Sequence, residues 1–218
     1  MAQSTTDHLN AVFLENLLSG NRTVCSEITH RYLDINPSIE DLYEELFRSS
    51  LYQVGKLWET NKISVATEHI ATAITEGLLN ELYERIISQK RQHKSVVLAC
   101  VENELHQVGI KMVGDIFEKN GWESFFLGAG IPTGELLRFM QQAKPNVLAI
   151  SLSVYFNLPN LLKMLNAIRI DFPALPILLG GQAIGLLTPE RLPENCRIFS
   201  DLHQLETYIE ELNNSHKN

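Results

Sequence analysis

The sequence has few cysteines, no long apolar run and no segment that resembles an export signal. Its three cysteines, Cys25, Cys100 and Cys196, are scattered and form no CxxC pair, which disfavours both disulfides and a thiolate metal cage. No apolar run reaches the length of about 18 residues that a membrane-spanning helix needs. The first ten residues lack the basic start and apolar middle of a signal peptide, so we expect a cytoplasmic protein.

Basic charge is also scarce. The chain has 18 Lys and Arg against 26 Asp and Glu, a formal net charge of −8. Because nucleic-acid binding relies on basic side chains that neutralise phosphates, we expect no direct contact with nucleic acid. Gly128-Ala129-Gly130 falls short of the GxGxxG motif, which disfavours a dinucleotide site.

Up to about residue 91, apolar residues recur every three or four positions, a spacing typical of amphipathic helices. Gly20 suits the end of a first helix, and Asn36-Pro37 suits the end of a second. Ser38 with Asp41 resembles a capping box that opens a third. The predicted helices cover residues 8–19, 22–34, 38–58 and 65–89, so we predict a four-helix bundle domain over residues 1–91.

From residue 92 onward, short apolar runs alternate with helical patterns. Strands that are apolar on both faces and separated by helices predict a parallel sheet covered on both sides. We therefore predict an α/β domain over residues 92–218, a doubly wound, flavodoxin-like five-stranded parallel sheet. The expected strands are 95–101, 124–127, 147–152, 176–180 and 197–199, and the expected helices are 107–120, 133–142, 157–171, 183–192 and 201–213.

Several unusual residues fall at the carboxyl ends of these strands, where doubly wound sheets bind ligands. His106 follows the first strand, Ser151 and Ser153 end the third, and Gly180-Gly181 ends the fourth. Each residue alone has an ordinary alternative, as a helix start, a helix cap or a tight turn. Together they predict a ligand site at one edge of the sheet.

The spacing of these residues resembles the cobalamin-binding domain, whose pattern is Asp-x-His-x-x-Gly, then Ser-x-Leu, then Gly-Gly. In this chain 41 residues separate the first element from the second and 26 separate the second from the third. The resemblance covers residues 93–215 and implies a Rossmann-like fold that binds cobalamin. The matching residues are Glu104, His106, Gly109, Ser151, Ser153, Gly180 and Gly181.

The resemblance also implies a role for each matching residue. His106 would bind cobalt in place of the cofactor's own nucleotide base, and Glu104 would fix the tautomer of that imidazole through the other ring nitrogen. Gly109 would let the displaced nucleotide tail pass close to the first helix. Ser151 would hydrogen-bond the benzimidazole, and Gly180-Gly181 would leave room beside it.

Two positions depart from the family pattern. Glu104 stands where the family has Asp, which lengthens the carboxylate side chain by one methylene group. Ser153 stands where the family has Leu, so the packing around the base is expected to differ.

The stretch WETNKISVATEH, from Trp58 to His69, places an aromatic residue and an adjacent Glu68-His69 pair on either side of a polar turn. An ordinary alternative is a core aromatic followed by a solvated helix start. The stretch also resembles the methionine-synthase-like helical cap of light-sensing, adenosylcobalamin-dependent regulators of the CarH/LitR type. That resemblance implies that Trp58, Glu68 and His69 line the cavity above cobalt and select the upper ligand.

The helical half also differs from these regulators. Some members have a histidine directly after the tryptophan, but this chain has Glu59, so a photoproduct with histidines on both faces of cobalt is not expected. The DNA-binding region that precedes the cap in these regulators is not expected here either.

The leading hypothesis is a cobalamin-binding sensor without catalytic turnover of its own. Adenosylcobalamin is the first choice of cofactor and methylcobalamin the second. The output would pass to a regulatory or signalling protein, or through a homo-oligomer. The alternative is a corrinoid methyl carrier of a methyltransferase system, and a third hypothesis is a sensor that binds another tetrapyrrole, a bilin or haem.

Overall fold

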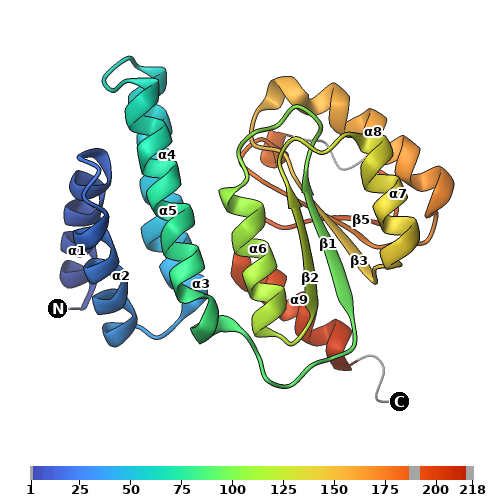
Figure 1. Ribbon diagram of the computed structural model, residues 1–218, viewed down its shortest axis with the longest axis horizontal. Helices are drawn as coiled ribbons and strands as arrows, with labels where there is room; N and C mark the ends of the chain where they lie inside the picture. The colour runs from blue at the N-terminus through green and yellow to red at the C-terminus, as the bar shows by residue number, and fades with distance from the viewer. Residues whose placement is uncertain (1, 187–191, 215–218) are drawn as a thin grey trace. The chain divides into compact units, whose positions relative to one another are not determined.

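The computed structural model describes residues 2–186 and 192–214, and the chain falls into two compact units (Figure 1). We call Met1–Arg85 the helical unit and Ile86–Asn218 the sheet unit. No helix within the described ranges is long and apolar enough to cross a bilayer.

The division between the units precedes the boundary that the sequence predicts at residues 91 and 92. The connecting segment is bonded to the sheet unit, which explains the difference. The Ser88 N–H donates to the Glu118 carbonyl, and the Gln92 N–H donates to the Gly121 carbonyl. The Arg91 side chain also pairs with the Glu118 carboxylate at 2.8 Å. The segment therefore belongs to the α/β half rather than to the bundle.

Side chains cap two helices of the helical unit at their N-termini, one of them at the predicted capping box of Ser38 and Asp41. The Asn21 side chain accepts a hydrogen bond from the Val24 N–H at 3.4 Å, and Ser38 Oγ accepts one from the Asp41 N–H at 3.1 Å. The first helix begins earlier than predicted. The elements are α1 (Ala2–Leu18), α2 (Arg22–Ile35), α3 (Ile39–Asp41), the π-helical segment η1 (Leu42–Arg48), α4 (Ser49–Glu59) and α5 (Val65–Ile86).

The third predicted helix is present without a break, but it is not α-helical throughout. Its middle part, η1, is a π-helical segment between α3 and α4. Its Phe47 ring is fully buried and stacks on the Phe13 ring of α1, with ring centroids 5.7 Å apart. The pattern of apolar residues did not predict this change, since α- and π-helical turns bury similar sets of side chains. The segment sits in the core of the helical unit.

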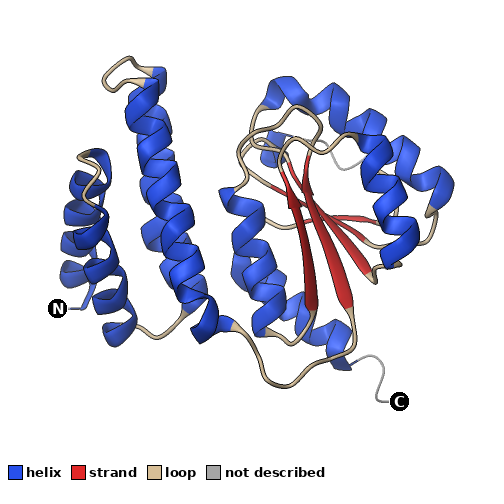
Figure 2. Ribbon diagram, in the orientation of Figure 1, coloured by secondary structure: helices blue, strands red, loops and turns tan. Residues whose placement is uncertain are grey.

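The sheet unit is a five-stranded parallel sheet with helices on both faces, which confirms the predicted doubly wound fold (Figure 2). The strand order is β2-β1-β3-β4-β5, so the order reverses between β1 and β3. The strands are β1 (Ser95–Cys100), β2 (Glu123–Gly128), β3 (Val147–Ser151), β4 (Ile177–Gly180) and β5 (Cys196–Ile198). The helices are α6 (Val108–Lys119), α7 (Thr133–Ala143), α8 (Leu158–Asp171) and α9 (Leu202–Asn214), with short 3₁₀ turns η2 (Tyr155–Asn157) and η3 (Ile184–Leu186).

The register of the sheet aligns the carboxyl ends of its central strands. Cys100 of β1 lies opposite Ser151 of β3, which in turn lies opposite Gly180 of β4. The loops that follow these three residues therefore begin side by side at the carboxyl edge of the sheet. Only part of the predicted helix over residues 183–192 can be compared, because residues 187–191 lie outside the described residues; the described part is the 3₁₀ turn η3.

Candidate functional site

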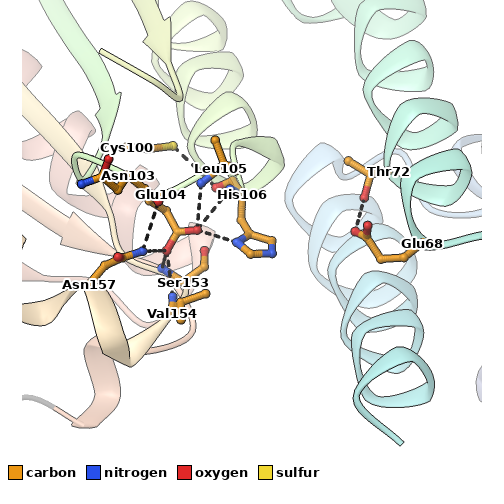
Figure 3. Close-up of polar contacts among 10 residues, drawn as sticks. All are labelled: Glu68, Thr72, Cys100, Asn103, Glu104, Leu105, His106, Ser153, Val154 and Asn157. Atoms are coloured by element: carbon orange, nitrogen blue, oxygen red, sulfur yellow. Dashed lines mark hydrogen bonds and ion pairs between the residues drawn. The ribbon is translucent and has the colours of Figure 1, made fainter. Parts of the chain in front are cut away.

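His106 lies in the loop between β1 and α6, at the carboxyl edge of the sheet (Figure 3). Its Nδ1 is 2.5 Å from Glu104 Oε1, so the ring donates to the carboxylate. The two side chains differ in exposure: the imidazole is 55% exposed, whereas the carboxylate is 1% exposed. The exposed imidazole of His106 is thus hydrogen-bonded to the buried carboxylate of Glu104.

The Glu104 carboxylate accepts hydrogen bonds from two loops. Oε1 takes the His106 ring and the backbone N–H groups of Leu105 and His106, at 3.1 and 3.2 Å. Oε2 takes the backbone N–H groups of Ser153 and Val154, at 3.2 and 2.9 Å, and the Asn157 side-chain amide at 3.3 Å. We call this arrangement the Glu104 clamp (Figure 3). It fastens the loop after β1 to the loop after β3, the two strands where the order reverses.

The Glu104 clamp keeps its carboxylate ionised. Burial alone raises the pKa of Glu104, but the hydrogen bonds from the His106 ring and from the Val154 and His106 backbone lower it to about 2. An ionised acceptor on Nδ1 keeps the proton on that nitrogen and makes the ring more basic. Nε2 of His106 is then the ring nitrogen suited to bind a metal.

Side chains of α7 and α8 also contact the loop that carries His106. Glu102 Oε2 accepts from Thr133 Oγ1 at 2.7 Å, at the start of α7, and the Glu102 carbonyl accepts from the Asn160 side chain at 3.3 Å. Asn103 has a left-handed backbone, with φ of 71°, a conformation that asparagine adopts more readily than most residues. The loop that carries His106 is therefore held by contacts with α7 and α8 as well as by the Glu104 clamp.

The predicted glycines fall into two kinds. Gly181 has φ of +104°, and a Cβ there would lie 2.4 Å from the Leu152 carbonyl oxygen, so the fold itself requires this glycine. A Cβ on Gly109 would meet nothing within 4 Å, and one on Gly180 would meet only the Phe199 carbonyl oxygen at 3.9 Å. The protein alone does not require glycine at Gly109 or Gly180, which fits space kept for a ligand.

The two serines also differ. Ser151 is buried at the end of β3, in the row with Gly180. Ser153 lies in the following loop and contributes its backbone N–H to the Glu104 clamp. The structure therefore gives Ser153 a contact that does not depend on its side chain, which explains how the loop accommodates Ser in place of Leu.

Sequence reasoning missed Asn157, which is buried and donates to Oε2 of Glu104. The pattern marked this residue only as the start of a helix. The Val154 backbone contact was missed as well, since backbone N–H groups leave no trace in residue identity. The one sequence feature that could have indicated Asn157 is its position, as a polar residue between the loop after β3 and an apolar helix.

In the helical unit, Trp58 is the penultimate residue of α4, and Glu68 lies in the first turn of α5, directly before His69. Trp58 is 44% exposed, so the alternative of a core aromatic is wrong. His69 Nδ1 lies 2.5 Å from Glu68 Oε2, and Thr72 Oγ1 donates to Glu68 Oε1 at 2.9 Å. The imidazole of His69 is 74% exposed, and the Glu68 side chain is 19% exposed.

Family comparison covers both halves of the chain. Residues 94–199 match one family model described as a B12 binding domain, and residues 9–83 match a second with the same description. The chain is a cobalamin-binding domain protein. This confirms the predicted fold family and cobalamin as the cofactor.

The curated relatives are bacterial regulators. Over 90 residues the chain is 30% identical to the HTH-type transcriptional repressor CarA of Myxococcus xanthus. The matched region covers 41% of this chain and 31% of that protein. Over 142 residues it is 25% identical to the HTH-type transcriptional repressor CarH of the same organism. That matched region covers 65% of this chain and 47% of that protein. The chain spans less than half the length of either relative.

Solved structures agree on the fold. The monomethylamine corrinoid protein of Methanosarcina barkeri superposes with a TM-score of 0.75 at 11% identity, over 94% of this chain and 99% of that one. A cobalamin-binding protein of Desulfitobacterium hafniense gives a TM-score of 0.50 at 18% identity, over 93% of this chain and 97% of that one. At these identities the similarity concerns the fold alone.

The residues of the cobalamin-binding domain protein fit its cofactor. Within the described ranges, no group of three His, Cys, Asp or Glu side chains is placed to hold a metal ion. Cobalamin supplies most of the ligands of its own cobalt, so the protein would need to add only a single imidazole and no cluster of side chains. His106 on the Glu104 clamp would supply such an imidazole, and the open positions at Gly109 and Gly180 would leave room for a nucleotide tail.

Proposed function

We propose that this chain is a cobalamin-dependent sensor module without catalytic turnover. The observation that carries the proposal is in the helical unit, where an exposed Trp58 accompanies the hydrogen-bonded Glu68-His69 pair. An aromatic side chain left outside the core is available to contact a ligand. Similarity to two transcriptional repressors, although over part of their length, supports a regulatory role.

In this proposal each unit has a separate task. His106 would bind cobalt through Nε2, Glu104 would hold the tautomer of its ring through their hydrogen bond, and Ser151 would contact the benzimidazole. Bound cobalamin supplies a cobalt whose upper ligand can be exchanged, or released by light when that ligand is an alkyl group. Trp58, Glu68 and His69 of the helical unit would contact an adenosyl group carried by the cofactor and would lose those contacts once that group is released.

The loss of these contacts is the signal. A ligand shifts a conformational equilibrium only by the difference in its affinity for the two states, so the helical unit itself would have to differ in conformation with and without the adenosyl group. The output then passes to a regulatory protein or to a second copy of this chain. No direct contact with nucleic acid is part of the proposal, in keeping with the net charge of −8.

The test compares cofactors in the dark and after illumination. The purified chain is loaded with adenosylcobalamin or methylcobalamin, and retention is measured by gel filtration with absorption detection. We expect preferential retention of adenosylcobalamin, a light-dependent spectral change, and loss of the preference in Trp58→Ala. Tyr52→Ala, which removes another partly exposed aromatic of α4, serves as the control and should keep the preference.

A corrinoid methyl carrier is the second candidate, favoured by the fold shared with the monomethylamine corrinoid protein. Equal retention of both cofactors, with no effect of Trp58→Ala, would contradict the sensor and support the carrier. The third candidate, a sensor of a bilin or haem, requires stoichiometric binding of that tetrapyrrole in competition with cobalamin.

A further inference from the structure

Basic residues are scarce in this acidic chain, yet several of them are concentrated directly before β1. Residues 90–94 read KRQHK and hold three of the 18 Lys and Arg residues together with one histidine. We call these five residues the basic segment. It reaches the sheet unit at the amino ends of β1 and β2, at the opposite end of β1 from the loop that carries His106 (Figure 1). The proposed function gives the basic segment no task.

The basic segment forms one wall of a pocket at this amino edge of the sheet, with a volume of about 280 Å³. Hydrogen bonding and close packing fix that wall. The Gln92 N–H donates to the Gly121 carbonyl at 2.8 Å, and a Cβ on Gly121 would lie 2.2 Å from the Lys90 carbonyl oxygen. The pocket is therefore part of the folded sheet unit. Its lining residues are Arg91, His93, Lys94, Gly121 and Glu123.

Lys94 brings a partly buried positive charge to the pocket. Its Nζ donates to the Leu212 carbonyl at 2.5 Å and lies 5.5 Å from the centroid of the Trp122 ring. Burial lowers the pKa of Lys94, and within residues 2–186 and 192–214 its ammonium group forms no ion pair with a carboxylate. Because a partly desolvated cation is costly without a counter-charge, an anion in the pocket would stabilise this ammonium group.

The other lining side chains add further donors. His93 has a left-handed backbone, with φ of 53°, and its exposed imidazole makes no hydrogen bond or ion pair with any other described residue. The Arg91 guanidinium is held in place by its 2.8 Å pair with Glu118. Glu123 is the one carboxylate among the five lining residues. Three nitrogen-bearing side chains thus face the pocket against one acid, a set that favours an oxyanion.

We propose that this pocket binds a phosphate-type oxyanion, with Lys94, His93 and Arg91 as its donors. Donors from three side chains suit an anion with several acceptor oxygens, which favours phosphate over a carboxylate. The phosphate group is free or part of a nucleotide. Binding would stabilise the sheet unit, since the anion binds the folded pocket and not the unfolded chain. The proposal depends neither on cobalamin nor on the sensor role of the helical unit.

The test titrates the full chain with pyrophosphate by calorimetry, at pH 6 and constant ionic strength. We expect saturable binding of one pyrophosphate per chain. Glu123→Gln removes the one repelling charge and should tighten binding about fivefold, whereas His93→Gln removes a donor that is partly protonated at this pH and should weaken it about threefold. Both side chains are exposed, so neither change should unfold the protein.

Two matched variants carry the same changes elsewhere. His8→Gln alters an exposed histidine of α1, and Glu135→Gln alters an acid in the first turn of α7, at the carboxyl edge of the sheet. Both should bind pyrophosphate as wild type does. A parallel titration with ADP identifies the source: tighter binding than pyrophosphate supports a nucleotide, and weaker or equal binding supports a free phosphate. Binding that does not saturate, or equal effects in the control variants, would overturn the proposal.

Discussion

The two glutamate-histidine pairs of this protein share one contact but differ in everything around it. In both, Nδ1 of the imidazole lies 2.5 Å from a carboxylate oxygen. The Glu104 carboxylate is 1% exposed and accepts from residues 49 to 53 positions away, whereas Glu68 is 19% exposed and its other partner, Thr72, is four positions away.

This difference separates a preorganised ligand from an adaptable one. The His106 pair depends on the fold of the whole sheet unit, so its geometry persists as long as that unit is folded. The His69 pair depends on one turn of α5, and its imidazole is 74% exposed, so it can change rotamer at little cost. We expect the first pair to hold the cofactor and the second to respond to changes in it.

The largest effect is expected from Glu104→Gln. The amide replaces one acceptor oxygen of the Glu104 clamp with a donor group, which leaves buried N–H groups without an acceptor, and the free energy of unfolding should fall by about 3 kcal/mol. Urea unfolding of the cofactor-free protein measures this loss. Glu135→Gln, at a half-exposed acid of α7, is the control and should change stability little. Equal stability of wild type and Glu104→Gln would remove the distinction between the two pairs.

The same variant has a defined pH dependence. The pKa of Glu104 is about 2 in the folded protein, below its ordinary value of 4.5. A lowered folded pKa contributes stability above the unfolded value, and that contribution is lost as the pH falls toward the folded value. The stability difference between wild type and Glu104→Gln should therefore shrink between about pH 5 and about pH 2. A difference that stays constant over this range would contradict an ionised clamp.

A smaller effect, of opposite sign for stability and binding, is expected from Gly109→Ala. The added methyl group meets nothing within 4 Å in a helix, so the free energy of unfolding should rise by about 0.5 kcal/mol. Cobalamin affinity should fall, since the methyl group enters space assigned to the nucleotide tail. Gly134→Ala is a matched control, because Gly134 holds the same second position of α7 and is equally open. It should raise stability similarly without a change in affinity.

The smallest effect is expected from Glu68→Gln. Its pair with His69 is local and the imidazole is 74% exposed, so the free energy of unfolding should change by about 0.5 kcal/mol or less. Unfolding measured alongside Glu104→Gln gives the ratio of the two effects directly. A loss from Glu68→Gln as large as that from Glu104→Gln would show that the helical pair is as firmly built as the clamp.

Much of the fold could be predicted because apolar periodicity records which faces are buried. The strands of the sheet unit were predicted to within one or two residues, and the parallel order followed from the helices between them. The π-helical segment from Leu42 to Arg48 could not be predicted, since a change of helical type leaves the apolar pattern nearly unaltered.

The sequence could predict only those parts of the site that depend on which residue stands at a position. Glu104 and His106 are close in sequence, so their pairing could be expected, and the longer acid retains the hydrogen bond to the ring. Asn157 and the Val154 backbone reach the same carboxylate across about fifty residues of chain, and only the folded sheet brings them together. The exposed state of Trp58 likewise depends on packing that its helical spacing did not reveal.

The most direct test of the account is the absorption spectrum of the cobalamin-loaded protein compared with that of His106→Ala. The account predicts that the cofactor in wild-type protein has its own base displaced and histidine bound to cobalt, and that His106→Ala loses this signature while its sheet unit remains folded. The same spectrum in both proteins would contradict His106 as the cobalt ligand.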